Sequence, residues 1–195
     1  MQYQKEVVRA RIIASALTEF EKHGFLDAQM RNIARGAGIA TGNLYRYFAG
    51  KDDLFDAIVK SVYQSIDALI TDQHAHIHHN QGNVKLVVKD IVAKIMLVFT
   101  QHGRELLIAA DQSRGSKHED FWTVLSGMVF QRIRQEMQKS ADDTDDLLIN
   151  LVASGFLQGM FTILRNIKEP RRAEELINRM LIFYFDDLSN RLRSY

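Results

Sequence analysis

The scarcity of proline is the feature that most constrains the fold of this chain. Pro170 is the only proline among 195 residues. Proline interrupts helices because it lacks a backbone N–H and clashes with the preceding turn. Elsewhere the apolar residues recur at the spacing of about 3.6 that places them on one face of a helix. The sequence therefore predicts an all-α protein with long, uninterrupted helices.

Glycine, proline and charge mark the ends of these helices. Gly24 is expected to end the first helix, and Pro170 to open the last one within its first turn. Asp52 and Asp53 stabilise the positive end of a helix that starts near residue 51. Residues 84–101 are apolar nearly all round, which predicts a helix surrounded on every side. Apart from two short helices before residue 50, the predicted helices are 4–23, 51 onward, 84–101, a short piece at 105–110, 118–139, 145–167 and 170–193, with a loop at 112–117.

Residues 34–54, ARGAGIATGNLYRYFAGKDDL, have the pattern of a helix-turn-helix followed by a helix start. Gly38 lies between two short helical patterns, where a tight turn requires a positive φ, and Ile39 supplies the apolar contact that holds the two helices together. Leu44 and Phe48 are expected to point into a small core. The residues around them combine hydroxyl groups, an amide and a cation, which suit phosphates and base edges. We interpret this stretch as a DNA-binding motif.

Charge is distributed unevenly along the chain. Residues 1–51 hold eight Lys and Arg against four Asp and Glu, whereas residues 52–195 hold 17 against 20. The overall formal charge of +1 therefore conceals a basic N-terminal head and a mildly acidic body. This distribution is typical of a DNA-binding domain joined to a domain that does not bind DNA.

The absence of cysteine excludes disulfides and thiolate metal sites and is consistent with a reducing cytoplasm. The sequence shows no signal peptide, and no apolar run of the length that spans a bilayer is expected. An enzyme is disfavoured because no cysteine nucleophile, phosphate loop, HExxH or GxSxG motif is present. No cofactor, metal or membrane contact is predicted.

Two further motifs have ordinary explanations. His74, His76, His78 and His79 have helical spacings that could hold a metal, but a solvated helix end is the favoured interpretation. The acidic run 142–146 lacks the glycine and the distal glutamate of a calcium loop, so a helix start is favoured there.

The head resembles the tetracycline-repressor (TetR) family of bacterial regulators. The matching residues are 20–24, Met30 to Ala34, the turn Ala37-Gly38-Ile39-Ala40, and the run Gly42, Leu44-Tyr45, Tyr47-Phe48, Lys51-Asp52 and Leu54. Ala28-Gln29 departs from the family pattern, in which a Thr or Ser caps the second helix, and Asp27 is the candidate cap instead. The resemblance implies a head at residues 1–50 and a helical ligand-binding and dimerisation body at 51–195.

The resemblance also implies which head residues contact DNA. It implies a cytoplasmic, nucleoid-associated bacterial regulator. The body of such a regulator would place two heads on double-stranded palindromic operator DNA. Base contacts are expected from Arg31, Thr41, Gly42, Asn43 and Arg46, and phosphate contacts from Tyr45, Tyr47 and Lys51.

The last two predicted helices carry more apolar surface than one buried face requires. Gly155 and Gly159 lie one turn apart and would allow close helix approach. This surface could be monomer core, but a homodimer in which the two helices meet their symmetry mates is favoured and is what the resemblance implies. The expected interface residues are Leu148, Val152, Gly155, Gly159, Ile177, Met180, Tyr184 and Leu188.

Aromatic and sulfur-containing residues of the body are usually core at helical spacing, but together they could line an effector pocket. The resemblance implies such a pocket, with candidates Tyr63, Met96, Phe99, His102, Trp122, Phe130, Phe156 and Gln158. The expected function is a dimeric repressor released from DNA by a small-molecule effector. The alternative is a DNA-binding protein of the same fold whose body binds a protein partner.

Overall fold

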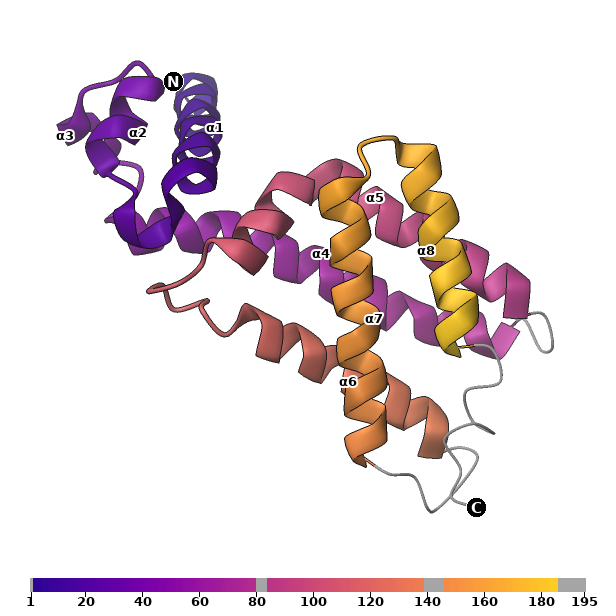
Figure 1. Cartoon of the computed structure of the whole chain (residues 1–195). Coiled ribbons are helices and arrows are strands. Elements are labelled where there is room, and N and C mark those ends of the chain that lie inside the picture. Colours follow the sequence, from indigo (N-terminus) through magenta and orange to yellow (C-terminus); the bar gives the residue numbers. More distant parts are fainter. Residues whose placement is uncertain (1, 80–83, 139–145, 186–195) are drawn as a thin grey trace. The chain divides into compact units, whose positions relative to one another are not determined.

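A computed structural model of the chain describes residues 2–79, 84–138 and 146–185, without the side chains of residues 2–3, 71–79, 84–89 and 136–138. The histidine cluster at 74–79 therefore lies outside the described side chains. All regular structure in the described ranges is α-helical, which confirms the predicted fold class (Figure 1). The helices are α1 (Gln2–Asp27), α2 (Met30–Gly36), α3 (Thr41–Leu44), α4 (Lys51–His79), α5 (Val84–Asp111), α6 (Phe121–Gln138), α7 (Asp146–Asn166) and α8 (Pro170–Phe185).

The described chain forms two compact units that do not follow the expected boundary at residue 50. The first unit joins Met1–Gln64 to His102–Phe121, and the second joins Ser65–Gln101 to Trp122–Tyr195. Helices α4 and α5 each contribute one part to each unit. The division into a DNA-binding part at residues 1–50 and a regulatory part at 51–195 therefore stays a prediction about function, since each compact unit combines two separate stretches of the chain.

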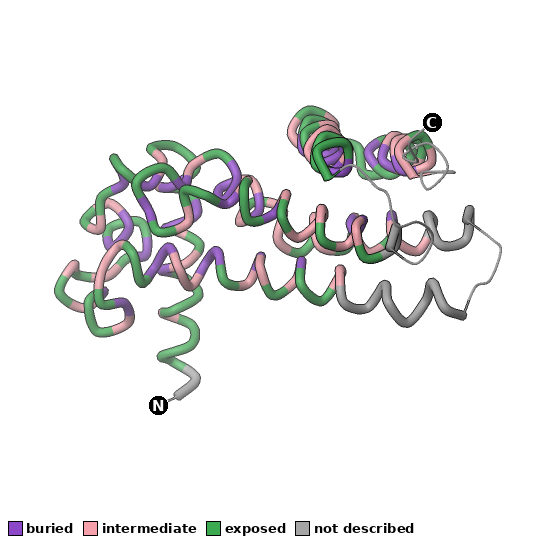
Figure 2. The backbone as a smooth tube through the Cα atoms, turned by 90° about the horizontal axis from the view of Figure 1, so that it is seen from below, coloured by how far each residue is buried: buried purple, intermediate pink, exposed green. Residues whose placement is uncertain are grey.

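The core of the first unit is aromatic. The rings of Phe20 and Phe25 lie at the end of α1, and each has its centroid 5.0 Å from the ring of Phe55 in α4. Phe20 and Phe55 have no exposed surface, and Phe25 is 4% exposed. The centre of this unit is the densely buried part of the tube in Figure 2. Because Phe55 closes the cluster, the head depends on the first turns of α4.

In the second unit, α7 and α8 form a helical hairpin whose buried residues lie on facing sides (Figure 2). Gly155 and Gly159 of α7 face α8 of the same chain. A Cβ atom at Gly155 would lie 3.0 Å from the Tyr184 hydroxyl, and one at Gly159 would lie 2.7 Å from the Met180 sulfur. The close approach that these glycines allow is therefore within the monomer.

Two expectations about the helices of the body are wrong, one about α5 and one about α7. Helix α5 is not surrounded on every side: Val92 and Ile95 are buried, but Leu97 is 55% exposed because the described part of the second unit covers one face only. The predicted break after residue 101 appears within α5 as a non-helical backbone at His102 (φ −134°, ψ 23°).

The second correction concerns α7, which is long and apolar enough to cross a membrane, with a mean hydropathy of 1.8 over its most apolar window. Such length was not expected of any segment. Core helices of proteins that never enter a membrane also reach these values, and α7 exposes Asn150 and Gln158, which lipid would disfavour.

Candidate nucleic-acid interface

The turn between α2 and α3 has the geometry that the sequence predicted. Gly38 adopts φ +67°, and the Ile39 N–H donates to the carbonyl of Ala34 at 3.0 Å. Arg11 of α1 donates to the carbonyl oxygens of Ala37 and Gly38, so a cation neutralises the negative end of α2. Sequence reasoning missed Arg11, because its partners lie 26 and 27 residues away.

The start of α2 is capped differently from the expectation. Gln29 occupies the N-cap position without a side-chain cap, so the prediction that Asp27 caps this helix is wrong. Glu19 of α1 instead holds the start of α2 to α1: its Oε1 accepts from the Gln29 N–H at 3.1 Å and from Asn32 Nδ2 at 2.9 Å. Partial burial opposes ionisation of Glu19, but these two hydrogen bonds prevail and lower its pKa.

The tip of the head presents polar groups to solvent. Tyr45 is 51% exposed, Arg46 is exposed, and Thr41 and Asn43 are half-buried, whereas Leu44 between them is fully buried. Beyond its chain neighbours and the backbone of its own helix, a Cβ atom at Gly42 would meet no atom within 4 Å, so the backbone there is open to a close approach. The predicted base-contacting residues of α3 are therefore at least partly accessible to solvent.

The remaining predicted DNA contacts differ in their surroundings. Arg31 is exposed on α2 and donates to Gln29 Oε1 at 3.2 Å, while Tyr47 is half-buried. Lys51 Nζ donates to the carbonyls of Leu26 and Ala28 at 2.8 and 3.2 Å. Its ammonium also lies 4.7 Å from the centre of the Phe25 ring. Lys51 thus links the end of α1 to the start of α4.

Residues 102–121, which lead into α6, are held to α1 and to the start of α4 at three places. Arg104 donates to both carboxylate oxygens of Glu21 at 2.7 Å, and the Phe25 N–H donates to the carbonyl of Gln112 at 2.9 Å. The third place is Asp56 of α4. The hydrogen bonds from Arg104 lower the pKa of Glu21 and raise that of Arg104.

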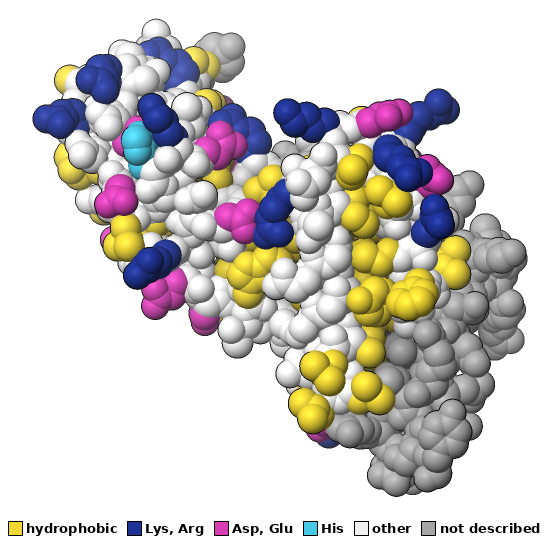
Figure 3. Space-filling model, in the orientation of Figure 1, with side chains coloured by type: hydrophobic (Ala, Val, Ile, Leu, Met, Phe, Trp, Pro, Cys, Tyr) yellow, Lys and Arg dark blue, Asp and Glu magenta, His cyan; other side chains and the backbone are white. Residues whose placement is uncertain are grey.

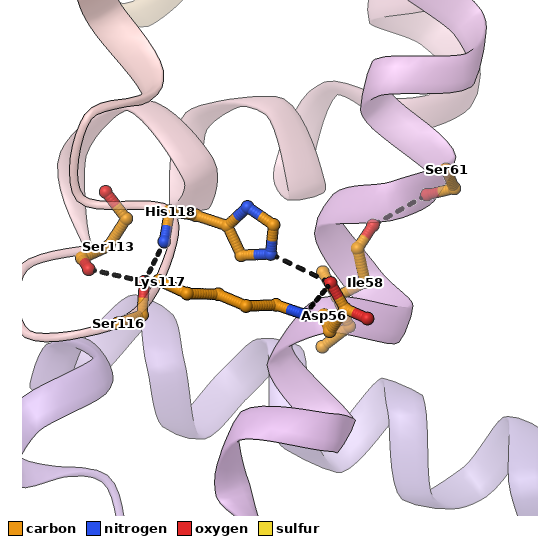
Figure 4. Close-up of polar contacts among 7 residues, drawn as sticks. All are labelled: Asp56, Ile58, Ser61, Ser113, Ser116, Lys117 and His118. Atoms are coloured by element: carbon orange, nitrogen blue, oxygen red, sulfur yellow. Dashed lines mark hydrogen bonds and ion pairs between the residues drawn. The ribbon is translucent and has the colours of Figure 1, made fainter. Parts of the chain in front are cut away.

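Asp56 Oδ1 receives two donors from the segment, Lys117 Nζ at 2.8 Å and His118 Nε2 at 3.0 Å (Figure 4). The bond from Lys117, helped by the one from His118, outweighs partial burial and lowers the pKa of Asp56. Ser116 Oγ accepts from the His118 N–H at 3.0 Å and donates to the Ser113 carbonyl at 2.7 Å, which gives the loop a defined shape. Residues of α1, α4 and the 102–121 segment thus form one support for α2 and α3.

The predicted effector residues do not form one site. Trp122, Phe130 and Gln158 line a groove of about 710 Å³ between α6 and α7. Phe156 is buried against Tyr184 and Phe185. Tyr63 packs in the first unit against His118 and Phe121, where burial and the charge of Asp120 raise its pKa. Met96, Phe99 and His102 are half-buried on α5 and do not line this groove.

The predicted dimer residues also separate. Ile177 is fully buried within the chain, and Val152 packs on a core cluster that contains Ile149. Leu188 lies outside the described residues. Leu148 is 37% exposed, and larger exposed fractions belong to residues that were not predicted: Leu147 at 66%, Leu151 at 60% and Phe183 at 72%. Figure 3 shows hydrophobic side chains gathered over α7 and α8.

A helix-turn-helix with an exposed polar tip, carried on a helical body, defines the class of DNA-binding transcriptional regulators. Comparisons agree with this class. Residues 12–58 match the model of the bacterial regulatory proteins of the tetR family. Over its head, the chain therefore resembles this TetR family of transcriptional regulators.

Relatives and solved structures extend the similarity over the body. The chain is 25% identical to the HTH-type transcriptional regulator UidR of Escherichia coli K12, over 90% of this chain and 89% of UidR. The fold is similar to FadR of Bacillus subtilis, solved with stearoyl-CoA (TM-score 0.58, 18% identity, 90% and 96% coverage). It is also similar to a gamma-butyrolactone receptor (TM-score 0.58, 20% identity, 91% and 97% coverage). UidR and FadR are transcriptional regulators, and the third protein is a receptor.

Proposed function

We propose that the protein is a cytoplasmic, dimeric repressor that binds palindromic operator DNA and is released by a small-molecule effector. The observation that carries this proposal is the tip of α3. An open Gly42 beside Thr41, Asn43 and Arg46 supplies donors, acceptors and room for a close backbone approach at accessible positions. Asn43 can bind an adenine edge bidentately, and Arg46 and Arg31 can bind guanine or phosphate.

Dimerisation is supported by exposed apolar side chains in the hairpin of α7 and α8. Leu147, Leu151 and Phe183 are more than half exposed. Large apolar side chains close together on a surface favour association, and an isologous two-fold contact buries such a patch on both partners at once. Two heads on one palindrome also bind more selectively than one, because each half-site contributes its own discrimination.

Release by an effector is supported by two of the similar proteins. FadR was solved with stearoyl-CoA, and the gamma-butyrolactone receptor is named for its ligand. A ligand that binds the released state better than the DNA-bound state lowers DNA affinity by the same factor, and DNA must lower the affinity for the ligand reciprocally. The groove between α6 and α7 is the candidate place for such a ligand.

The test is selection of bound DNA from a random pool, followed by titration of the selected sequence. We expect an inverted repeat whose half-sites lie about one helical turn or a multiple of it apart. Asn43→Ala should relax one position in each half-site, at a cost of about 1 to 3 kcal/mol there. Recovery of sequences without any shared motif would refute operator recognition, and equal losses on selected and random DNA would remove the base contact from Asn43.

A further inference from the structure

The groove between α6 and α7 has one wall of unusual composition. Helix α7 is the helix that reaches a mean hydropathy of 1.8, yet Asp146, Asn150, Ser154 and Gln158 recur on it at every fourth position. All four line the groove. Residues four apart lie on the same side of a helix, so these side chains form one polar stripe along a helix that is otherwise apolar.

The opposite wall comes from α6 and adds hydroxyl groups and aromatic rings. Thr123 and Ser126 line the groove together with Trp122 and Phe130. Ser126 Oγ lies 3.2 Å from Ser154 Oγ, so the two walls are joined by a hydroxyl pair. Leu157, which is 2% exposed, contributes apolar surface. The groove therefore offers amides and hydroxyls above an apolar base, which is the composition of a small-molecule site.

The charge of the groove restricts what it can take. Asp146 is the only ionisable residue among the described residues that line it, and Arg134 Nε lies 3.3 Å from its carboxylate. An anionic ligand would meet no lining cation, and desolvating an unpaired charge is costly. A cationic ligand would have to compete with Arg134. An uncharged ligand that exchanges hydrogen bonds with amides and hydroxyls fits this surface best.

The first two residues of α6 connect this groove to the head. Trp122 lines the groove, and its ring centroid lies 4.6 Å from that of Phe161. Phe121, the preceding residue, has no exposed surface and belongs to the first unit, where its ring centroid lies 5.6 Å from that of Tyr63. Trp122 and Phe121 share the backbone at the start of α6, so a displacement of the helix at Trp122 also shifts Phe121.

From Phe121 the contacts continue to the support of α2 and α3. The ring of Tyr63 lies 5.7 Å from that of His118, and His118 donates to Asp56 in the second turn of α4. Packed rings and a hydrogen bond of this kind form a continuous physical network that can carry coupling between two sites.

We propose that the groove between α6 and α7 is the effector site, that it takes a small uncharged molecule with amide or hydroxyl groups, and that its occupancy reaches the head through Phe121, His118 and Asp56. This inference rests on the proposed function as a ligand-responsive regulator. The lever is the start of α6, and the contact that changes is the one between His118 and Asp56.

The absence of cysteine from the chain allows a test without a known effector. Ser126→Cys places a single thiol in the groove, and Thr162→Cys places one on an exposed position of α7 outside it. Each variant is equilibrated under 2-mercaptoethanol with three disulfide fragments of equal length that end in an amide, a carboxylate or an ammonium group. Mass spectrometry gives the fraction of each adduct, and Trp122, the only tryptophan, reports groove occupancy by fluorescence.

We expect the Ser126→Cys variant, relative to the Thr162→Cys variant, to favour the amide fragment over the carboxylate fragment by roughly fivefold, the ratio expected of one net hydrogen bond. In the same variant the amide fragment should also exceed the ammonium fragment. Equal ranking of the fragments in the two variants would mean that the groove recognises nothing. Preference of the Ser126→Cys variant for the carboxylate or the ammonium group would overturn the assigned ligand class.

The route is tested on the same adducts by hydrogen exchange of the backbone amides in residues 51–58 and 113–121. The amide adduct of the Ser126→Cys variant should reduce their protection, and the adduct of the Thr162→Cys variant should not. When Asp56→Asn is combined with Ser126→Cys, the protection should already be low and the adduct should change it little. Unchanged exchange in the Ser126→Cys adduct would overturn the route. Neither measurement involves DNA, so a failure of operator binding would be recognised separately.

Discussion

His118 Nε2 lies 3.0 Å from Asp56 Oδ1, although the two residues are 62 positions apart in the sequence. The imidazole is 13% exposed and packs near the rings of Phe55 and Tyr63. Asp56 follows directly after Phe55, whose ring closes the aromatic core of the head. The 102–121 segment is therefore a structural part of the DNA-binding head rather than a simple connection within the body.

Lys51 is expected to act mainly through the folded head. Its ammonium donates to two carbonyls, so Lys51→Met should lower the free energy of unfolding by about 1 kcal/mol, discounted from the value for a buried charged hydrogen bond because the group is partly solvated. Thermal unfolding measures this loss. The slope of DNA affinity against salt should be unchanged, and a decrease by about one unit would instead assign Lys51 to a phosphate.

Gly24 and Gly42 form a matched pair of substitutions. Gly24 adopts φ +67°, and an added Cβ would lie 3.0 Å from Gln112 Oε1, so Gly24→Ala should destabilise the protein by more than about 1 kcal/mol. Gly42 lies within α3 with open space around it, so Gly42→Ala should leave stability unchanged or raise it by about 0.5 to 1 kcal/mol. Urea unfolding of both variants measures the difference.

The affinity for DNA provides a second test of Gly42→Ala. Gly42→Ala is expected to weaken operator binding because a methyl group would separate the backbone from the groove of the DNA. Full operator affinity in a well-folded Gly42→Ala protein would show that the backbone of α3 does not approach the DNA closely at this position.

The exposed apolar residues of α7 are the expected dimer contacts. Leu151→Glu should shift the protein from dimer to monomer in sedimentation, because a charge replaces a 60% exposed apolar side chain that would be buried between partners. Thr162→Glu, on an exposed polar position of the same helix, is the control and should remain dimeric. Dimers of equal stability in both variants would exclude the start of α7 from the interface.

Local features of this protein were predictable from sequence, and contacts between distant segments were not. Gly38 marks the turn because only a residue that tolerates positive φ suits it, and the start of α4 and the ends of α6 and α7 followed from periodicity and charge to within a few residues. The start of α2 was mispredicted because the carboxylate that binds the Gln29 N–H there belongs to Glu19 of another helix.

The roles of Gly155 and Gly159 show the same limit. Their spacing indicates close helix packing, but it does not say whether the neighbouring helix belongs to the same chain or to a partner. Tyr184 and Met180 of the same chain occupy the adjacent space. Periodicity also could not distinguish the exposed Leu151 from the buried Ile149, since both are apolar positions of one apolar helix.

The contact of Asp56 with Lys117 and His118 should make stability depend on pH in the acidic range. Because the folded-state pKa of Asp56 is lowered, its stabilising contribution is present above the unfolded-state value of about 3.9 and is lost as the pH falls through the lower folded-state value. Asp56→Asn should therefore lower the free energy of unfolding at pH 6 to 7 by about 0.2 to 1 kcal/mol, the range for partly exposed ion pairs. The difference between the variant and the wild type should shrink as the pH is lowered through the acidic range.

Asp52→Asn removes an exposed carboxylate from the first turn of the same helix and serves as the control for the helix dipole. Urea unfolding at a series of pH values measures both variants, and a penalty for Asp56→Asn that is the same at pH 7 and at pH 3 would show that the ionised carboxylate does not contribute through Lys117 and His118.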